Sequence, residues 1–552
     1  MYKNRAVVST QPCESRSFQI CLQARIFIII LIGYGSAPCG SGKTHQSVNR
    51  AVELVRDGER VLFLSPTKEL STKTAANELT GRVRSRIINE DTVGKGNVTA
   101  KLVDHFKAPS ETVEGLVFAT HAVLPLIPFI ANERRLHVIV DEEIQVIQYA
   151  CHRLPIMHPL ITDDIKLEPH NSIYSRIFPA NLSSLRNKGR NQANDECLGV
   201  IAQTIRRLTN PNWLNYVNTE QYERLRRGET QTLAFHSILS PAIVKGFASV
   251  FMTAANFEAT MLYRLWESWN ATDHDASFAS QPAFIRNDTF LNALRFQSHQ
   301  NGHLLTIYYG MNATNSKERL KDGGTETDSR NNRERLIDTI KRLFGEEPFV
   351  WQANKAYDDN PFGTNASRLP NVPHGLNDYA AYHNIAFLSA LHPTPDHYRF
   401  LANRGLDATA VYHAIYHQAL YQSLMRTALR NPDNQQPIKA IVPDLGAAQY
   451  VQSVFVGAKI VKADSGIVED ALTIKKAGRR RKWQDEAEKK RHQRQQAQER
   501  HIELLNRQLS LVLRLQYMNL NGIGVDESDT PPEAPSRNYL ILYGQKRDAA
   551  SA

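Results

Sequence analysis

The feature that most constrains this chain is a short run of small residues that follows an apolar segment. The apolar segment, residues 26–32, is typical of a buried strand, and the run after it reads Ala37-Pro38-Cys39-Gly40-Ser41-Gly42-Lys43-Thr44. A strand, a glycine-rich turn and a helix let backbone N–H groups and the positive end of the helix converge on one anion. The run therefore predicts a phosphate-binding loop, the P-loop, in which residues 38–44 bind ATP. Lys43 is expected to reach the β- and γ-phosphates, and Thr44 to bind Mg²⁺.

A pair of carboxylates after another apolar segment strengthens this prediction. Residues 136–140 are hydrophobic and lead into Asp141, Glu142 and Glu143. Because the carboxyl ends of parallel strands meet at one edge of a sheet, these carboxylates are expected beside the P-loop. Asp141 is predicted to hold Mg²⁺ through water, and Glu142 to polarise the water that attacks the γ-phosphate. Lys43, Asp141 and Glu142 are thus the predicted core of an ATP-hydrolysing site.

Composition places the chain among globular proteins of two or three domains. It has 552 residues, and its longest apolar run is far shorter than the roughly 20 residues that a membrane helix needs. The five cysteines form no Cys-x-x-Cys pair, which argues against a zinc site or a disulfide framework. No membrane association is therefore expected, and the cysteine usage indicates a reducing, cytoplasmic location.

The net charge of +10 is concentrated near the C-terminus. Residues 475–500 hold eleven Lys or Arg and four Asp or Glu, a local charge of +7. This segment predicts contact with a polyanion. The predicted phosphate or groove contacts are Arg479, Arg480, Arg481 and Lys482. A solvated basic helix that tethers the end of the chain explains the same residues, and both interpretations stay open.

Apolar runs alternate with helical stretches along most of the chain, which is typical of parallel α/β sheets. A first series of strands is predicted at residues 26–32, 61–65, 116–120, 136–140 and 249–253, and a second at 303–309, 349–354, 385–389 and 438–442. The predicted fold class is α/β, with two parallel-sheet domains in tandem at residues 25–260 and 300–465. The remaining predicted parts are an N-terminal lead-in at 1–24, a helical insertion in the first domain at about 150–245, a loop or linker at 321–334, and a basic helical C-terminal extension at 470–552.

Further motifs occur in a fixed order around these strands. Three of them end strands of the first series: Leu64-Ser65-Pro66-Thr67-Lys68-Glu69-Leu70, Ala119-Thr120-His121 and Thr253-Ala254-Ala255. In the second half, His374-Gly375-Leu376-Asn377 precedes a strand, and Gln422-Ser423-Leu424-Met425-Arg426-Thr427-Ala428-Leu429-Arg430 follows it. Together with the P-loop and the Asp-Glu-Glu-Ile box, this order resembles the superfamily-two helicases and translocases over roughly residues 25–460.

The resemblance implies two RecA-like domains that bind ATP and nucleic acid along the cleft between them. It implies nucleic-acid contacts at Pro66, Thr67, Lys68, Thr120, His121, Gly375 and Asn377. It implies that Thr253, Ala254 and Ala255 link hydrolysis to domain movement. It also implies that Gln422, Arg426 and Arg430 act at the γ-phosphate from the second domain, with one arginine as a finger. Arg426 is favoured as the finger with Arg430 in support, and the choice between them stays open.

Two departures from the family pattern narrow the expected subclass. The box reads Asp-Glu-Glu-Ile, and no aromatic–Pro–Gln arrangement of the adenine-reading type precedes the P-loop. The pattern looks more similar to helicases of phages, plasmids and integrated elements, which act on DNA. The expected partner is therefore DNA, as a single strand or a fork, with RNA still open. Replication or recombination partners are expected to bind through the insertion or the extension.

Two other functions remain as alternatives. A viral DNA-packaging ATPase also pairs a P-loop with Asp-Glu, but it should carry a nuclease domain with three or four carboxylates on strands. The second half of this chain instead shows the motifs at 374–379 and 422–430. The other alternative is a DNA-binding loader or switch protein with an ATP site but no unwinding. The presence of Glu142 together with a finger candidate favours turnover over a switch.

Overall fold

The computed structural model describes residues 28–79, 81–127, 130, 133–154, 157–269, 280–323, 328–354, 360–370 and 378–468. Several predictions lie outside these residues: the lead-in at 1–24, the extension at 470–552, Gly375 and Asn377, and the basic cluster of Arg479, Arg480, Arg481 and Lys482. Within the described ranges, no helix has the length and apolar composition that crossing a bilayer requires.

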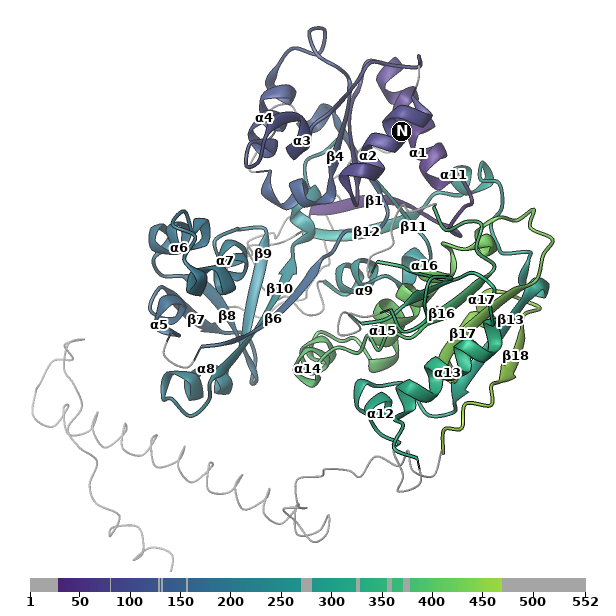
Figure 1. Ribbon diagram of the computed structural model, residues 1–552. Coiled ribbons are helices and arrows are strands. Elements are labelled where there is room, and N and C mark those ends of the chain that lie inside the picture. Colours follow the sequence, from purple (N-terminus) through teal and green to yellow (C-terminus); the bar gives the residue numbers. More distant parts are fainter. Residues whose placement is uncertain are drawn as a thin grey trace, which may run out of the picture. The chain divides into compact units, whose positions relative to one another are not determined.

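The first domain is built on a seven-stranded sheet in which all paired strands run parallel (Figure 1). The five strands predicted for this domain are present, and β3 and β12 were not predicted. β12 lies past residue 260, where the sequence analysis ends the domain. In spatial order the strands are β12 (Ser280–Arg286), β1 (Ile28–Ser36), β11 (Ser249–Ala254), β5 (Leu136–Asp141), β2 (Arg60–Ser65), β4 (Leu116–Thr120) and β3 (Ser85–Ile87).

The register of this sheet brings the predicted motifs to one edge. β11 lies between the P-loop strand β1 and the carboxylate strand β5, with Thr253 level with Gly35 on one side and Asp141 on the other. β2 pairs with β4 so that Ser65 is level with Thr120. Because parallel strands end at the same edge, the loops that follow these strands are neighbours.

The helix that follows the P-loop is amphipathic. α1 (Lys43–Arg56) buries Val48, Ala51 and Val52, which lie three and four residues apart on one face. They pack in one core cluster with Val61 and Ile139 of the sheet, so the helix start is fixed beside the strand ends. The other helices of this domain are α2 (Lys68–Glu78), α3 (Glu90–Val93), α4 (Val98–Lys107), α9 (Met261–Glu267) and α11 (Asp288–Asn292).

Between β5 and β11 the chain forms a five-stranded antiparallel sheet, so the prediction of a helical insertion is wrong. β9 and β10 bury consecutive residues, so they lack the alternation of apolar and polar residues that marks a strand in a sequence. In spatial order the strands are β6 (Ile147–Arg153), β10 (Thr232–Leu239), β9 (Trp213–Asn218), β8 (Tyr174–Pro179) and β7 (Ile165–Pro169). Four helices accompany them: α5 (Pro159–Thr162), α6 (Leu182–Arg190), α7 (Glu196–Leu208) and α8 (Thr219–Arg226).

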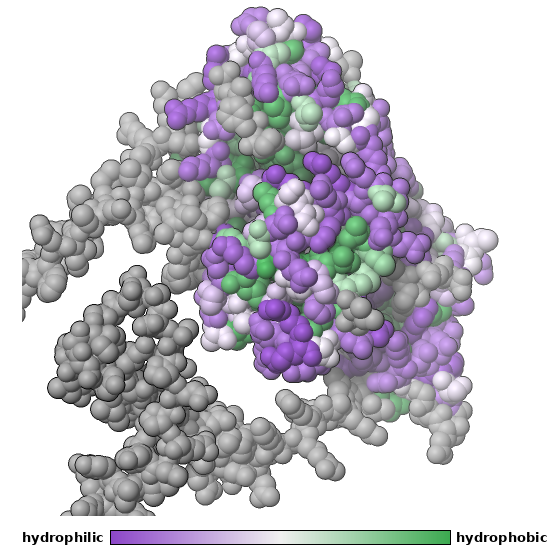
Figure 2. Space-filling model, turned by 90° about the vertical axis from the view of Figure 1, so that its left-hand side faces the viewer, coloured by the Kyte–Doolittle hydropathy of each residue, from purple (hydrophilic) through white to green (hydrophobic). Residues whose placement is uncertain are grey.

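The insertion sheet is covered by two different parts of the chain. Its own helices pack on it through a core that includes Ile205, Leu225 and Phe235. A second contact is made by α14 (Pro395–Asn403) of the second domain, where the stacked rings of His236 and Phe400 have centroids 4.1 Å apart. Figure 2 views the molecule from the side of the insertion, where hydrophilic residues cover most of the surface and hydrophobic ones form small separate patches.

Polar side chains extend the contact between the insertion and α14. Arg404 is 2% exposed, and its guanidinium lies 5.1 Å from the centre of the Tyr216 ring. The same guanidinium donates a hydrogen bond to His170 Nε2 at 3.2 Å. Asn171 Nδ2 donates to Asn403 Oδ1 at 2.8 Å. The insertion interrupts the first domain in sequence but is therefore attached to the second domain in space.

The second domain contains a six-stranded parallel sheet, and the predicted class of two parallel-sheet domains in tandem is confirmed. All four strands predicted for this half are present. In spatial order the strands are β15 (Ala366–Arg368), β14 (Phe349–Gln352), β16 (Asn384–Phe387), β17 (Ile438–Asp444), β13 (Leu305–Met311) and β18 (Lys459–Lys462). The further helices are α12 (Lys317–Lys321), α13 (Asn332–Phe344), α15 (Ala408–Tyr412), α16 (Gln418–Leu424) and α17 (Leu445–Val454).

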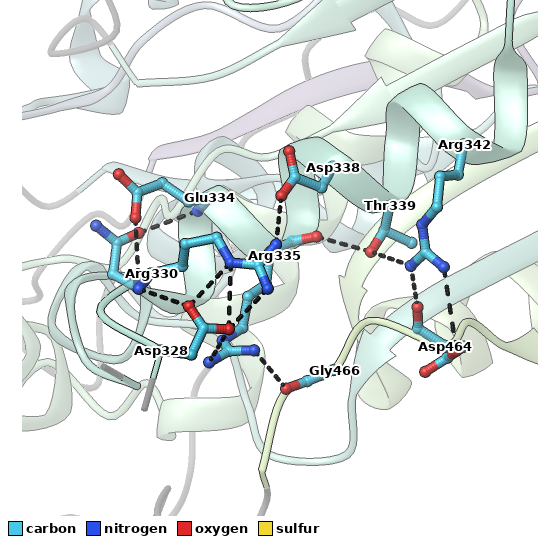
Figure 3. Close-up of polar contacts among 10 residues, drawn as sticks. Asp328, Arg330, Glu334, Arg335, Asp338, Thr339, Arg342, Asp464 and Gly466 are labelled. Atoms are coloured by element: carbon cyan, nitrogen blue, oxygen red, sulfur yellow. Dashed lines mark hydrogen bonds and ion pairs between the residues drawn. The ribbon is translucent and has the colours of Figure 1, made fainter. Parts of the chain in front are cut away.

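Figure 3 shows the ion pairs and hydrogen bonds around the start of α13, which also contacts the segment that follows β18. Asp328 pairs with Arg330 at 2.7 Å and with Arg335 at 3.1 Å. Arg335 also donates to the carbonyl oxygen of Gly466 at 3.1 Å. The stretch 321–334, expected to be a loop or linker, includes the last residue of α12 and the first turn of α13, so the prediction is wrong at both ends.

We predict that acid pH weakens the fold at the contact between the insertion and α14. Burial lowers the pKa of His236 to about 3 and that of His397 to about 4, from 6.5. Below about pH 6.5 the unfolded chain therefore binds protons that the folded chain does not, so the free energy of unfolding should fall as the pH decreases toward about 4. Urea unfolding at a series of pH values measures this slope.

Two variants test the assignment of this slope. His397→Phe keeps a ring in the contact without a titrating nitrogen, so it should remove part of the pH dependence. His303→Gln replaces an exposed histidine and should leave it unchanged. The same slope in the wild type and in His397→Phe would show that the buried pair is not responsible.

Candidate active site

The P-loop joins β1 to α1, and two glycines determine its shape. Gly40 and Gly42 have φ angles of 82° and 94°, in the left-handed region that strains other residues. The N–H of Ser41 donates to the carbonyl of Pro38 at 3.3 Å, which closes the turn. Lys43 is 6% exposed, and its Nζ donates to two carbonyl oxygens of the loop at 3.0 and 2.9 Å. The ammonium group is therefore held within the loop that is predicted to bind phosphate.

Asp141 ends β5 beside the start of α1 and is 1% exposed. Its carboxylate accepts hydrogen bonds from Thr44 Oγ1 at 2.8 Å and from Thr253 Oγ1 at 3.2 Å. Burial and the charge of Glu142 raise the pKa of Asp141 to about 6, while the Thr44 hydroxyl and the charge of Lys43 act in the opposite direction. A cation beside this carboxylate would favour its charged form, so the setting suits a metal ligand.

The two carboxylates after Asp141 have different surroundings. Glu142 has a φ of 68°, a left-handed conformation that costs a residue other than glycine about 1–2 kcal/mol. Strain of this kind clusters at functional sites, where the surrounding structure fixes the backbone. Glu143 accepts the N–H of Leu262 at 3.2 Å, at the start of α9, and burial raises the pKa of Glu143 to about 7. Glu143 thus attaches the turn to α9, and Glu142 remains the candidate for polarising water.

α16 of the second domain lies directly against the P-loop. The N–H of Cys39 donates to Tyr421 Oη at 2.8 Å. The thiol of Cys39 donates to Gln422 Oε1 at 3.5 Å, and Arg426 Nη2 donates to the same oxygen at 2.8 Å. Cys39 packs within a hydrophobic cluster formed mainly by the second domain. The structure therefore brings the predicted Gln422 and Arg426 to the P-loop of the first domain.

The two finger candidates occupy different environments. Arg426 is 3% exposed; burial lowers the pKa of its guanidinium, and the charge of Glu142 acts in the opposite direction. Arg430 lies over the loop itself, since a Cβ atom added at Gly40 would come within 3.0 Å of Arg430 Cγ. Arg426 is thus buried and bonded to Gln422, whereas Arg430 lies against the phosphate loop.

The predicted coupling residues contact three different parts of the site. Thr253 donates to Asp141, as described above. The carbonyl of Ala254 accepts the N–H of Ala37 at 3.3 Å, and the carbonyl of Ala255 accepts Gln418 Nε2 at 3.1 Å. One short segment therefore connects the carboxylate strand, the P-loop and α16.

The predicted nucleic-acid contacts of the first domain lie after β2 and β4, which are neighbours in the sheet. Pro66 precedes Thr67, whose hydroxyl accepts the N–H of Leu70 and caps α2. Lys68 Nζ lies 2.7 Å from Asp91 Oδ1, on the exposed surface. Thr120 ends β4, and His121 Nε2 donates to the backbone carbonyl of Asp141 at 2.9 Å. The structure brings these residues to one edge, and their contact with nucleic acid stays a prediction.

A segment that returns to the P-loop after α11 was not predicted from the sequence. The N–H of Arg295 donates to the carbonyl of Ser41 at 3.0 Å, and its side chain lies beside Gly42. His299 Nε2 lies 3.0 Å from Tyr421 Oη, the group that also accepts the Cys39 N–H. The available signal was weak, because this role comes from a tertiary return of the chain and no local motif marks it.

The side chains of this site fit Mg²⁺ and a nucleotide phosphate. Ser41 Oγ is buried and has no hydrogen-bond partner among the described residues, so this loop atom is available to a ligand. Thr44 and Asp141 supply oxygens of the kind that Mg²⁺ prefers. In the described part of the chain, no group of three or more His, Cys, Asp or Glu could hold a metal.

The fold and the site define a protein with two parallel α/β domains and a P-loop that contacts both. No family model matches the chain, and no curated protein sequence matches it. Among solved structures, it is similar to an XPD helicase, with 11% identity, a TM-score of 0.44, and coverage of 78% of this chain and 96% of that one. It is also similar to Dbp5 of S. cerevisiae bound to RNA and ADP BeF3, with 11% identity, a TM-score of 0.33, and coverage of 78% and 85%. At such identities and TM-scores, the likeness carries no functional argument.

We predict that the Tyr421 hydroxyl protects the backbone of the P-loop. Tyr421→Phe removes the acceptor of the Cys39 N–H, and leaving a buried donor unpaired costs about 1–3 kcal/mol. The loop should then open more often, so hydrogen–deuterium exchange of peptides that cover residues 37–44 should become about tenfold faster. Tyr222→Phe is the matched control, because the buried hydroxyl of Tyr222 donates to the carbonyl of Thr162 in the insertion, and this variant should leave the exchange unchanged. Equal exchange in the wild type and in Tyr421→Phe would contradict the prediction.

Proposed function

We propose that this chain is an ATP-dependent helicase or translocase that moves along nucleic acid, with DNA as its track. The observation that supports this most strongly is the contact of α16 with the P-loop residue Cys39 through Tyr421 and Gln422, with Arg426 bonded to Gln422 just past the helix. A nucleotide site built from two domains changes the relation of those domains when its occupancy changes, which is what movement along a strand requires. A site confined to one domain would not provide this link.

The proposed hydrolysis follows from the positions of four side chains. Lys43 would turn from the loop carbonyls to the β- and γ-phosphates, and Thr44 and Asp141 would hold Mg²⁺, Asp141 through water. Mg²⁺, when bound, neutralises charge on the phosphates. Glu142 orients the attacking water and accepts its proton, and the guanidinium of Arg426 stabilises the charge that develops on the γ-phosphate.

Coupling to nucleic acid is proposed to pass through residues 253–255. A change at Asp141 would alter its bond to Thr253 and, through the carbonyl of Ala255, the position of α16. Movement of the second domain would shift its contacts with the nucleic-acid strand relative to those of the first domain. The first set is Pro66, Thr67, Lys68, Thr120 and His121, and the second is proposed at Gly375 and Asn377, with Arg479, Arg480, Arg481 and Lys482 as further phosphate contacts.

We predict ATP hydrolysis that depends on a polymer. Steady-state hydrolysis should be compared without nucleic acid and with single-stranded DNA, duplex DNA and RNA. Single-stranded DNA should stimulate strongly, and Glu142→Gln should lower kcat by about 10²–10⁴-fold in every condition, because the general base is lost. If RNA alone stimulates ATP hydrolysis, the protein moves along RNA and the assignment of DNA is wrong. A rate of ATP hydrolysis that is the same with and without every polymer would contradict the motor function and favour the loader or switch protein.

We also predict that substitutions of Arg426 and Arg430 have different effects on kcat and KM. Arg426→Gln should lower kcat by about 10³-fold or more with a small change in KM, because an arginine finger acts in the transition state. Arg430→Gln should mainly raise KM, since Arg430 lies against the loop that holds the bound nucleotide. Arg399→Gln, in an exposed pair with Asp396 on α14, is the control and should change neither value. The reverse pattern would assign the finger to Arg430.

A further inference from the structure

Next to the P-loop lies a pocket of about 350 Å³ that the proposed hydrolysis does not use. One wall is the segment after α11, formed by residues 295–296 and 298–301, and the other is the turn that follows α16, residues 429–433. The volume lies within the range of sites that hold small organic ligands. The pocket is therefore large enough to hold part of a nucleotide.

Both walls of the pocket begin at the phosphate loop. Arg295 donates its N–H to the carbonyl of Ser41 at 3.0 Å, and a Cβ atom added at Gly42 would lie 3.8 Å from Arg295 Cγ. On the other side, Arg430 Cγ would lie 3.0 Å from a Cβ atom added at Gly40. The pocket therefore adjoins the loop at Gly40 and Gly42, within reach of a molecule whose phosphates occupy the loop.

Buried hydrogen bonds hold the two walls together. Asn301 is 3% exposed, and its Nδ2 donates to the carbonyls of Leu429 at 2.9 Å and Asn431 at 3.2 Å. His299 contacts Tyr421 Oη, and burial lowers the pKa of His299 to about 4, so its ring is neutral at physiological pH. The pocket is therefore preorganised and is connected to the loop through Tyr421.

The chemistry of the pocket suits a flat aromatic group with a polar edge. Phe296 offers a ring, and the guanidiniums of Arg295 and Arg430 offer planar cations, both of which stack on nucleic-acid bases. Gln300 and Asp433 add hydrogen-bonding groups for a ribose or a base edge.

We infer that this pocket binds the base and ribose of the nucleotide, with Phe296 and Arg430 as the stacking groups. The inference rests on the proposed function, because it requires a nucleoside triphosphate in the P-loop. Stacking tolerates every base, since each has a π-face. The four common ribonucleoside triphosphates should therefore bind with affinities that differ by less than about tenfold.

The test compares ATP with inorganic triphosphate, which has the phosphates but no nucleoside. Calorimetry should show that the wild type binds ATP more tightly than triphosphate. Phe296→Ala should weaken ATP binding by about tenfold and leave triphosphate binding unchanged, whereas Phe296→Tyr should retain both. Gln297→Ala is the neighbouring control, because its side chain bonds back to Leu291 and Asn292 outside the pocket.

The outcomes separate this inference from the proposed function. Equal binding of ATP and triphosphate by the wild type, or unchanged ATP binding in Phe296→Ala, would overturn the pocket assignment and leave the P-loop intact. Loss of both ligands in Phe296→Ala would also overturn it, since the effect would lie in the loop. A wild type that binds neither ligand, or a Lys43→Ala variant that binds both as well as the wild type, would overturn the proposed function itself.

Discussion

The buried carboxylate of Asp141 is the constraint on which the rest of the structure depends. A carboxylate removed from water needs hydrogen-bond donors or a cation to stay charged. Thr44 supplies one hydroxyl from the start of α1, and Thr253 supplies another from the end of β11. The strand order β1-β11-β5 makes this possible, because Thr253 reaches the carboxylate from the strand that lies between the other two. The strand order of the sheet therefore places the hydrogen-bond donors that the carboxylate needs.

The same edge of the sheet explains why the second domain belongs to the site. Ala254 holds the first residue of the P-loop, and Ala255 holds Gln418 of α16. From α16, Tyr421 returns to the P-loop at Cys39. These contacts form a closed path through both domains. The proposed motor function is an interpretation of this path.

The sequence was most informative where a function needs consecutive residues. The P-loop and the Asp-Glu pair have a local mechanism, and the structure places Lys43, Thr44 and Asp141 together as expected. The order of the motifs was enough to predict that Gln422 and Arg426 lie at this site. The insertion sheet was missed because β9 and β10 are buried without alternation, and Arg295 was missed because only the folded chain brings it to Ser41. The roles proposed for Thr67 and Lys68 stay predictions, since both side chains have partners within the protein.

The contact between the insertion and α14 has a mechanical consequence. The second domain meets the rest of the chain at the P-loop, through α16, and at the insertion, through the stack of His236 on Phe400. If the first contact opens with each nucleotide and the second stays closed, the insertion becomes a pivot and the second domain a lever. The displacement at the nucleotide site then grows with its distance from the pivot. The insertion would in that case determine the length of the stroke without touching the nucleotide.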